Sequence, residues 1–130
     1  MVENARVCAF RGIRGAITAA ADDKVSIESA TKRLLEEITR RNEIELDDIA
    51  SVLFTVTPDL HAAFPALAAR AMGWTWVPML HACEIDVPGS LGKCIRVLMH
   101  VNTTRRPEEI EHVYLDGAVG LRPDLLRGNP

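Results

Sequence analysis

Arg96 is the residue whose surroundings most strongly indicate chemistry. It lies in the apolar run KCIRVLMHVN, directly between Ile95 and Val97. A buried guanidinium without a partner costs several kcal/mol, so Arg96 must meet a carboxylate, a carbonyl or an anionic ligand. Of the 15 basic residues 12 are arginines, and a guanidinium presents a planar fork of donors to carboxylates and phosphates. Arg96 therefore predicts either an anion site or a structural salt bridge.

Three further polar residues are candidates for the same site. Arg14 lies between Gly12 and Gly15, where glycine allows a close backbone approach, although a solvated loop arginine is the alternative. Glu84 lies in the apolar-flanked stretch HACEIDV, and a bridge to a nearby basic residue is its structural interpretation. Tyr114, in EHVYLDG, has a hydroxyl that could donate to a ligand or to a partner within the core.

The cysteines and histidines form no recognisable catalytic or metal-binding pattern. Cys8, Cys83 and Cys94 include no CxxC, and the four histidines show no HExxH or Cys/His spacing, so we expect no metal. No spacing supports a thiol nucleophile at Cys83 or Cys94. An isolated histidine such as His81 is more often structural than catalytic. Glycine-rich nucleotide-binding motifs are also absent from the sequence.

Charge and hydropathy exclude several partners. The net charge of −3 argues against nucleic acid, and no apolar run approaches the roughly 18 residues that span a bilayer. The first residues, MVENARVCAFRG, lack the order of a signal peptide. The odd number of cysteines fits reduced thiols. We expect a soluble, cytoplasmic protein without membrane or nucleic-acid partners.

The elements that must position these residues follow from periodicity. We predict helices over 27–42, capped by Ser26, and over 66–72, started by Pro65. Strands are predicted over 5–12, 50–56, 74–80, 93–102 and 111–115, with an irregular link over 81–90. In the strand 93–102, Ile95, Val97, Met99 and Val101 share one face, and Cys94, Arg96, Leu98 and His100 share the other.

This order of elements predicts an α+β fold. Two main helices would cover one face of a mixed β-sheet, and 130 residues suit a single domain over 1–130. The other sheet face would stay exposed in a monomer, so oligomerisation is expected to cover it. Residues 1–8 would form an N-terminal extension, and about 122–130 a mobile C-terminal tail.

Five ordered segments resemble one known family. They are Arg11-Gly-Ile-Arg-Gly-Ala16, Thr57-Pro-Asp-Leu-His61, Phe64-Pro-Ala66, Gly89-Ser-Leu91 with Cys94-Ile-Arg-Val97, and His112-Val-Tyr-Leu115 with Leu121-Arg-Pro-Asp-Leu125. Together they are similar to the monofunctional AroH-class chorismate mutases over about residues 9–125. The resemblance implies an isomerase that converts chorismate to prephenate by a Claisen rearrangement, without metal or cofactor. It also implies a homotrimer with a pseudo-α/β-barrel core and active sites at the subunit interfaces.

The resemblance also implies roles for the candidate residues. Arg96 would donate to the breaking ether oxygen, Glu84 would accept from the ring hydroxyl, and Arg14 and Tyr114 would bind carboxylate. The remaining substrate-binding positions would be Phe64, Ala66, Arg70, Met79, Leu80, His81, Ala82, Cys83, Leu121 and Arg122. Among these, Leu121 would close the pocket, and Arg70 and Arg122 would be mobile basic residues at its mouth.

Three positions depart from the family pattern. Leu67 stands where some members have a lysine, so any contact from that lysine to a carboxylate is lost. Leu80 and His81 stand where some members have threonine and cysteine, although backbone groups of 80–84 could still bind. His81 could take over the contact with the ring hydroxyl and make ligand affinity depend on pH.

A second function class stays open at this point. A non-catalytic, trimeric module of RidA-like architecture could bind small carboxylates through an interface arginine. Such a module needs an arginine but has no use for an opposed glutamate, so the pair of Arg96 and Glu84 discriminates between the two. A purely structural interaction protein would leave these residues without a common purpose.

Overall fold

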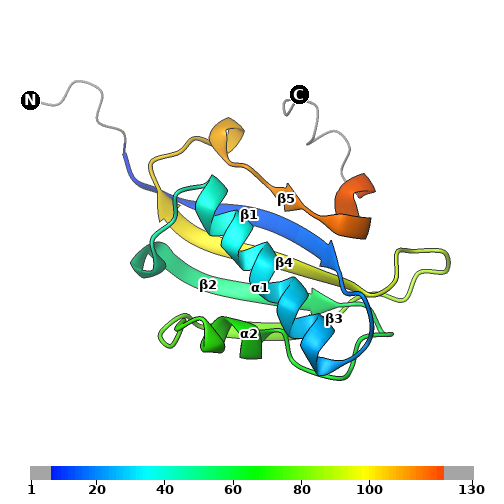
Figure 1. The fold of residues 1–130 in the computed structure, drawn as a ribbon. Coiled ribbons are helices and arrows are strands. Elements are labelled where there is room, and N and C mark those ends of the chain that lie inside the picture. Colours follow the sequence, from blue (N-terminus) through cyan, green and yellow to red (C-terminus); the bar gives the residue numbers. More distant parts are fainter. Residues whose placement is uncertain (1–6, 122–130) are drawn as a thin grey trace, which may run out of the picture.

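A computed structural model describes residues 7–121, which form one mixed sheet with two helices. The five strands are ordered β3-β2-β4-β1-β5, and Figure 1 shows α1 and α2 on the same face of the sheet. The α+β architecture predicted from the sequence is confirmed. The elements are β1 (Ala9–Thr18), α1 (Lys24–Arg41), β2 (Ile49–Val56), α2 (Ala66–Ala71), β3 (Met79–Cys83), β4 (Cys94–Thr103) and β5 (Val113–Tyr114), with short 3-10 turns at Leu46–Asp48, Pro107–Glu109 and Asp116–Gly120.

Strand β4 lies at the centre and pairs antiparallel with both neighbours. Its register places Arg96 between Ala16 of β1 and Thr55 of β2. On the far side of β1, the parallel strand β5 brings Tyr114 beside Ala16. Because side chains alternate along a strand, residues paired across strands share a face. One row across the sheet therefore carries Thr55, Arg96 and Tyr114 on the face away from the helices.

The helix-covered face holds the main core. Alternate residues of β4, from Ile95 to Val101, are buried there together with Phe54 of β2 and the apolar stripe of α1. The alternation predicted for 93–102 is confirmed. Gly15 permits the close packing of α1 on β1: a Cβ at this position would lie 2.7 Å from Cδ1 of Ile38.

The opposite face, which we call the open face, has little cover from residues 7–121. A small cluster of Ala16, Cys94, Tyr114 and Ala118 is buried at one corner, with Leu91 and Leu121 packed against it. Elsewhere on this face large apolar side chains remain exposed. Phe10 is 60% exposed, and Leu80, on the edge strand β3, is 72% exposed.

The first strand differs from the prediction because it begins later and runs further. β1 spans Ala9–Thr18 rather than 5–12, so Arg14 lies inside a strand and does not follow its end. The two glycines of this segment interrupted the apolar pattern without interrupting the strand. Gly15 is instead required by the approach of α1.

The strand predicted over 74–80 is displaced towards the C-terminus. β3 spans Met79–Cys83, so part of the predicted irregular link is a strand. Residues 74–78 are instead a turn region in which Trp74 and Val77 are buried. Trp74 N–H donates to the carbonyl of Ala69 and closes the end of α2, so its apolar character reflects core packing and not strand pairing.

The first helix starts earlier than predicted. It begins at Lys24, and the carboxylate of Asp23, not Ser26, caps it by accepting a hydrogen bond from the N–H of Ser26 at 2.7 Å. A carboxylate at this position also interacts favourably with the positive end of the helix dipole. Residues 1–6 and 122–130, which contain most of the predicted extension and the predicted mobile tail with Arg122, lie outside the described residues. Within 7–121, no helix is both long and apolar enough to cross a membrane.

Candidate active site

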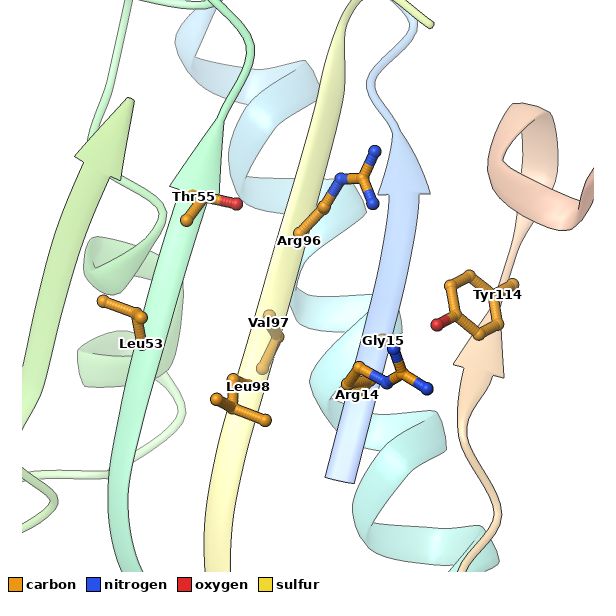
Figure 2. A pocket seen from close by; sticks show the side chains of 8 residues that line it. All are labelled: Arg14, Gly15, Leu53, Thr55, Arg96, Val97, Leu98 and Tyr114. Atoms are coloured by element: carbon orange, nitrogen blue, oxygen red, sulfur yellow. The ribbon is translucent and has the colours of Figure 1, made fainter. Parts of the chain in front are cut away.

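A shallow cavity of about 220 Å³ opens on the open face, across four neighbouring strands. Figure 2 shows its polar side chains arriving from different strands: Arg14 from β1, Thr55 from β2, Arg96 from β4 and Tyr114 from β5. The rest of the lining is Gly15, Leu53, Val97 and Leu98. The cavity thus combines an apolar floor with two guanidinium groups and two hydroxyls.

Arg96 meets Glu84 at one end of this cavity. Its Nε lies 3.1 Å from Oε2 of Glu84, and the two side chains are 42% and 19% exposed. Arg96 is therefore less buried than its sequence surroundings suggested, because its guanidinium end reaches the cavity. The Nε atom itself is buried, and its N–H is not aligned to form a hydrogen bond. The attraction between the two groups is that of opposite charges in contact.

Glu84 owes its place to the strand pairing of β2 and β3. Its backbone N–H donates to the carbonyl of Val56, continuing the ladder one residue beyond Cys83. Its carboxylate turns to the open face, where Oε2 accepts a hydrogen bond from the hydroxyl of Thr55. A residue predicted to lie in an irregular link is therefore held by a sheet register.

Arg14 and Tyr114 occupy the opposite end of the cavity. The backbone N–H of Arg14 donates to Nδ1 of His112 at 2.9 Å. Its side chain is exposed, and among the described residues its guanidinium has no acidic partner. Tyr114 is only 7% exposed and is anchored in the small corner cluster. Leu121, predicted to close the pocket, packs against that cluster.

A second and larger cavity, of about 540 Å³, lies at the other face of the sheet beside α2. Phe64, His81, Ala82 and Cys83 line it, as does Leu67, the residue that replaces a lysine of some relatives. Its other lining residues are Lys24, Val56, Leu60, His61, Ala62, Ala63 and Pro65. Of the predicted site residues, Arg14, Arg96 and Tyr114 thus line the first cavity, and Phe64, His81, Ala82 and Cys83 line the second.

His81 points to the helix-covered face and away from Arg96 and Glu84. Its ring stacks on Phe54 at 5.4 Å and lies 5.2 Å from the ring of Phe64. Its Nε2 accepts a hydrogen bond from the N–H of Ala66 at 3.1 Å. Burial, and then the positive charge of Arg70, lower the pKa of His81. Within one chain it therefore cannot touch a ligand held between Arg96 and Glu84.

The remaining predicted residues take several positions. Ala66 is buried at the start of α2, and Arg70 is exposed near its end. Met79 packs against the main core rather than lining either cavity, while Leu80 stands exposed on the edge strand. Burial raises the pKa of the Cys94 thiol, which keeps it protonated and unsuited to act as a nucleophile. Among residues 7–121, no group of three or more His, Cys, Asp or Glu side chains is placed to hold a metal ion.

The family model described as chorismate mutase type I matches residues 10–125. The chain belongs to the type I chorismate mutase family. Two curated chorismate mutases named AroH support this. The protein of Bacillus subtilis is 49% identical over 117 residues, which cover 89% of this chain and 92% of that one. The protein of Thermus thermophilus is 51% identical over 116 residues, which cover 88% and 95%.

A solved structure agrees with this assignment. A chorismate mutase from Clostridium thermocellum matches with a TM-score of 0.82 and 55% sequence identity, over 83% of this chain and 96% of that chain. The family resemblance read from the sequence is confirmed, and so is the α+β fold predicted for the chain.

Two groups of arginines in this type I chorismate mutase differ in their partners. Several pair with acidic side chains at the molecular surface: Arg33 with Asp116, Arg40 and Arg41 with Glu37, and Arg105 with Glu43. The guanidinium groups of Arg14 and Arg70 have no such partner among the described residues. Some of the many arginines therefore form ion pairs, whereas Arg14 lines the first cavity and Arg70 lies close enough to His81 to lower its pKa.

Two residues of the site were missed by the sequence analysis. Thr55 lies in the apolar strand ASVLFTV, and its only signal was its place in the alternation, one residue after Phe54. His112 was seen only as part of the segment HVYL, with no role assigned. Both act on other site residues, through contacts between segments 29 and 98 positions apart, which no local pattern reveals.

Proposed function

We propose that this chorismate mutase converts chorismate to prephenate with the open-face cavity as the catalytic half of its site. The reaction is intramolecular: the ether C–O bond breaks while a new C–C bond forms, and no atom or proton is gained or lost. The polarised transition state places negative charge on the ether oxygen and partial positive charge on the ring. A suitable site must hold the compact conformer and stabilise both charges.

The pair of Arg96 and Glu84 is the observation that carries this proposal. The guanidinium end of Arg96 reaches the cavity, where it can donate to the ether oxygen as negative charge develops. Glu84 lies beside it, where its carboxylate can accept from the ring hydroxyl and face the positive fragment. A non-catalytic carboxylate-binding module is not favoured, because it would gain nothing from a carboxylate next to its arginine.

Arg14 and Tyr114 complete the proposed binding of the dicarboxylate. They line the same cavity as Arg96, from β1 and β5, and a guanidinium without an acidic partner is suited to a substrate carboxylate. Leu121, packed beside Tyr114, would then close this end, with Arg122 following it in sequence.

We propose that the complete site forms between subunits of a homotrimer. Phe64, His81 and Arg70 lie on the helix side of the sheet, so they cannot join Arg96 in the same chain. A neighbouring copy could bring its Phe64 and Arg70 to the open face, where exposed Leu80 and Phe10 offer apolar contact area. In a closed homotrimeric ring, each copy would cover the open face of one neighbour.

The enzymatic assignment is tested with purified protein and chorismate. We expect a first-order loss of the near-ultraviolet absorbance of chorismate, with prephenate as the product, in the absence of added metal or cofactor. This step would supply the branch of the shikimate pathway that leads to phenylalanine and tyrosine. Unchanged absorbance at high enzyme concentration would contradict the proposed function.

The subunit arrangement is tested by mixing two inactive variants. Arg96→Ala and Arg70→Ala damage different halves of the proposed site, so each alone should lose activity. Trimers reassembled from an equal mixture should regain about a quarter of the wild-type activity, because that fraction of interfaces combines the two intact halves. Light scattering should give three times the 14.3 kDa mass of the chain. Absence of any recovery, with exchange of subunits demonstrated, would contradict a shared site.

We also propose a cytoplasmic location. Cys8, Cys83 and Cys94 are all free thiols in the structure, as expected for a protein of a reducing compartment.

A further inference from the structure

Thr55 lines the open-face cavity and contacts Glu84, but the sequence analysis did not include it in the predicted site. It lies on β2 directly opposite Arg96 in the register of β2 and β4, and its side chain lines the open-face cavity. Its hydroxyl donates a hydrogen bond to Oε2 of Glu84. Glu84, directly after β3, Thr55 on β2 and Arg96 on β4 thus bring together a carboxylate, a hydroxyl and a guanidinium.

The hydroxyl of Thr55 forms the one hydrogen bond that the Glu84 carboxylate makes within residues 7–121. Arg96 Nε lies 3.1 Å from the same oxygen, but its N–H is not aligned with it. Charge attraction alone depends weakly on direction, whereas a hydrogen bond fixes the orientation of the acceptor. The contact that restricts the orientation of the Glu84 carboxylate is therefore the one from Thr55.

We propose that Thr55 is a positioning residue for the mutase reaction, acting through Glu84. By engaging Oε2, it turns the other oxygen, Oε1, towards the ligand and holds the carboxylate beside Arg96. Glu84 is thereby kept from rotating into a closer, bidentate pairing with the guanidinium, which would withdraw donors that the ether oxygen needs. The β-branched side chain supports this role, because its χ1 angle is restricted in a strand.

The inference rests on the proposed function, and its test is a matched set of variants assayed as intact oligomers. Thr55→Val keeps the shape and the preference for a strand and removes only the hydroxyl, whereas Thr55→Ser keeps the hydroxyl. We expect Thr55→Val to lower kcat by about ten- to a hundredfold, the range for a hydrogen bond to a charged group, with KM changed far less. Thr55→Ser should stay within about threefold of wild type, since it restores the donor.

Two controls separate positioning from a general effect on the sheet. Ser51→Ala removes another hydroxyl from the same face of β2, one that is bonded to His100 rather than to Glu84, and it should leave kcat nearly unchanged. The second control repeats the Thr55→Val change in a Glu84→Gln background. If Thr55 acts through the carboxylate, its removal there should cost less than about threefold, because the two effects are not additive for a coupled pair.

The outcomes distinguish this inference from the function on which it rests. Wild-type protein without mutase activity contradicts the proposed function. Active wild type with Thr55→Val inside threefold in kcat, or with the full loss repeated in the Glu84→Gln background, overturns the positioning role alone. If Thr55→Val does not give a folded oligomer by circular dichroism and light scattering, Thr55→Ala is judged by the same two criteria.

Discussion

The two faces of the sheet differ in polarity and in burial. The helix-covered face is filled by side chains such as Phe54, Met99 and Leu34, each fully buried, and its contacts are satisfied within the chain. The open face holds Arg14, whose guanidinium has no acidic partner within residues 7–121, and the half-exposed Arg96. One strand, β4, supplies residues to both faces by simple alternation.

This difference shows how a small chain can combine stability with a reactive site. The apolar face provides folding free energy that does not depend on ligand. The open face presents the exposed guanidinium of Arg14 and the half-exposed guanidinium of Arg96 to the solvent, where an anionic ligand or a neighbouring subunit can pair with them. Substitutions on the two faces should therefore separate into losses of activity and losses of stability.

The largest expected effect is on the open face. Arg96→Ala should cost about 3–6 kcal/mol of transition-state stabilisation, above the usual loss for one oxyanion donor, because a full charge is removed. The ratio kcat/KM of the variant against wild type gives this number directly. Arg33→Ala, which removes an exposed arginine paired with Asp116, is the matched control and should remain active. A drop below tenfold for Arg96→Ala would mean that Arg96 is structural.

A loss of stability rather than of activity is expected for Phe54, which lies in β2 with its side chain on the helix-covered face. Phe54→Ala removes a fully buried ring and should lower the free energy of unfolding by about 3–5 kcal/mol. Under conditions where the variant is still folded, its kcat should change much less than that of Arg96→Ala. Denaturant titration together with kinetics checks both parts. Equal damage to kcat and to stability would remove the division between the faces.

A smaller effect should appear where the helix meets the sheet. Gly15→Ala would place a Cβ 2.7 Å from Ile38 and 3.2 Å from the carbonyl oxygen of Val113, so something must shift, at about 1–3 kcal/mol. Gly120→Ala is the control, since a Cβ there would meet nothing within 4 Å. Thermal unfolding of the two variants should differ clearly. Equal melting temperatures would contradict the tight packing of α1 on β1.

The smallest effect concerns pH and the helix-covered face. Burial, and then the charge of Arg70, lower the pKa of His81 in the folded chain. As the pH falls, His81 is therefore protonated in the unfolded chain before it is protonated in the folded chain. The stability linked to a neutral His81 is complete above its ordinary pKa, near 6.5, and falls as the pH drops below that value. His81→Ala should therefore flatten the fall of unfolding free energy between about pH 7 and 5. Parallel curves for the two proteins would contradict this account.

The same variant tests the predicted contact of His81 with the ligand. If His81 of a neighbouring subunit touches the ring hydroxyl, the rate of His81→Ala across pH 5–8 should lose a dependence that wild type shows. An identical pH dependence of the rate would assign His81 to structure alone, as its hydrogen bond to Ala66 favours.

Much of the fold could be predicted from local patterns. The helical stripe of α1 and the alternation of β4 are strong signals, because each depends on periodic burial against a single surface. The errors occurred where apolar residues are buried without regular structure, as with Trp74, or where glycines lie within a strand, as in β1. Local propensity does not distinguish a strand from an apolar loop that packs on the core.

The sequence by itself determined which residues carry charge among apolar neighbours, and which of them share a face of β4. It also determined the family, through segments that extend over nearly the whole chain. Only the tertiary structure decided that Glu84 meets Arg96, that Thr55 holds the carboxylate and that His81 turns away. Those outcomes depend on strand register, since a shift of one residue would move every side chain to the other face, and register is set by contacts between distant segments.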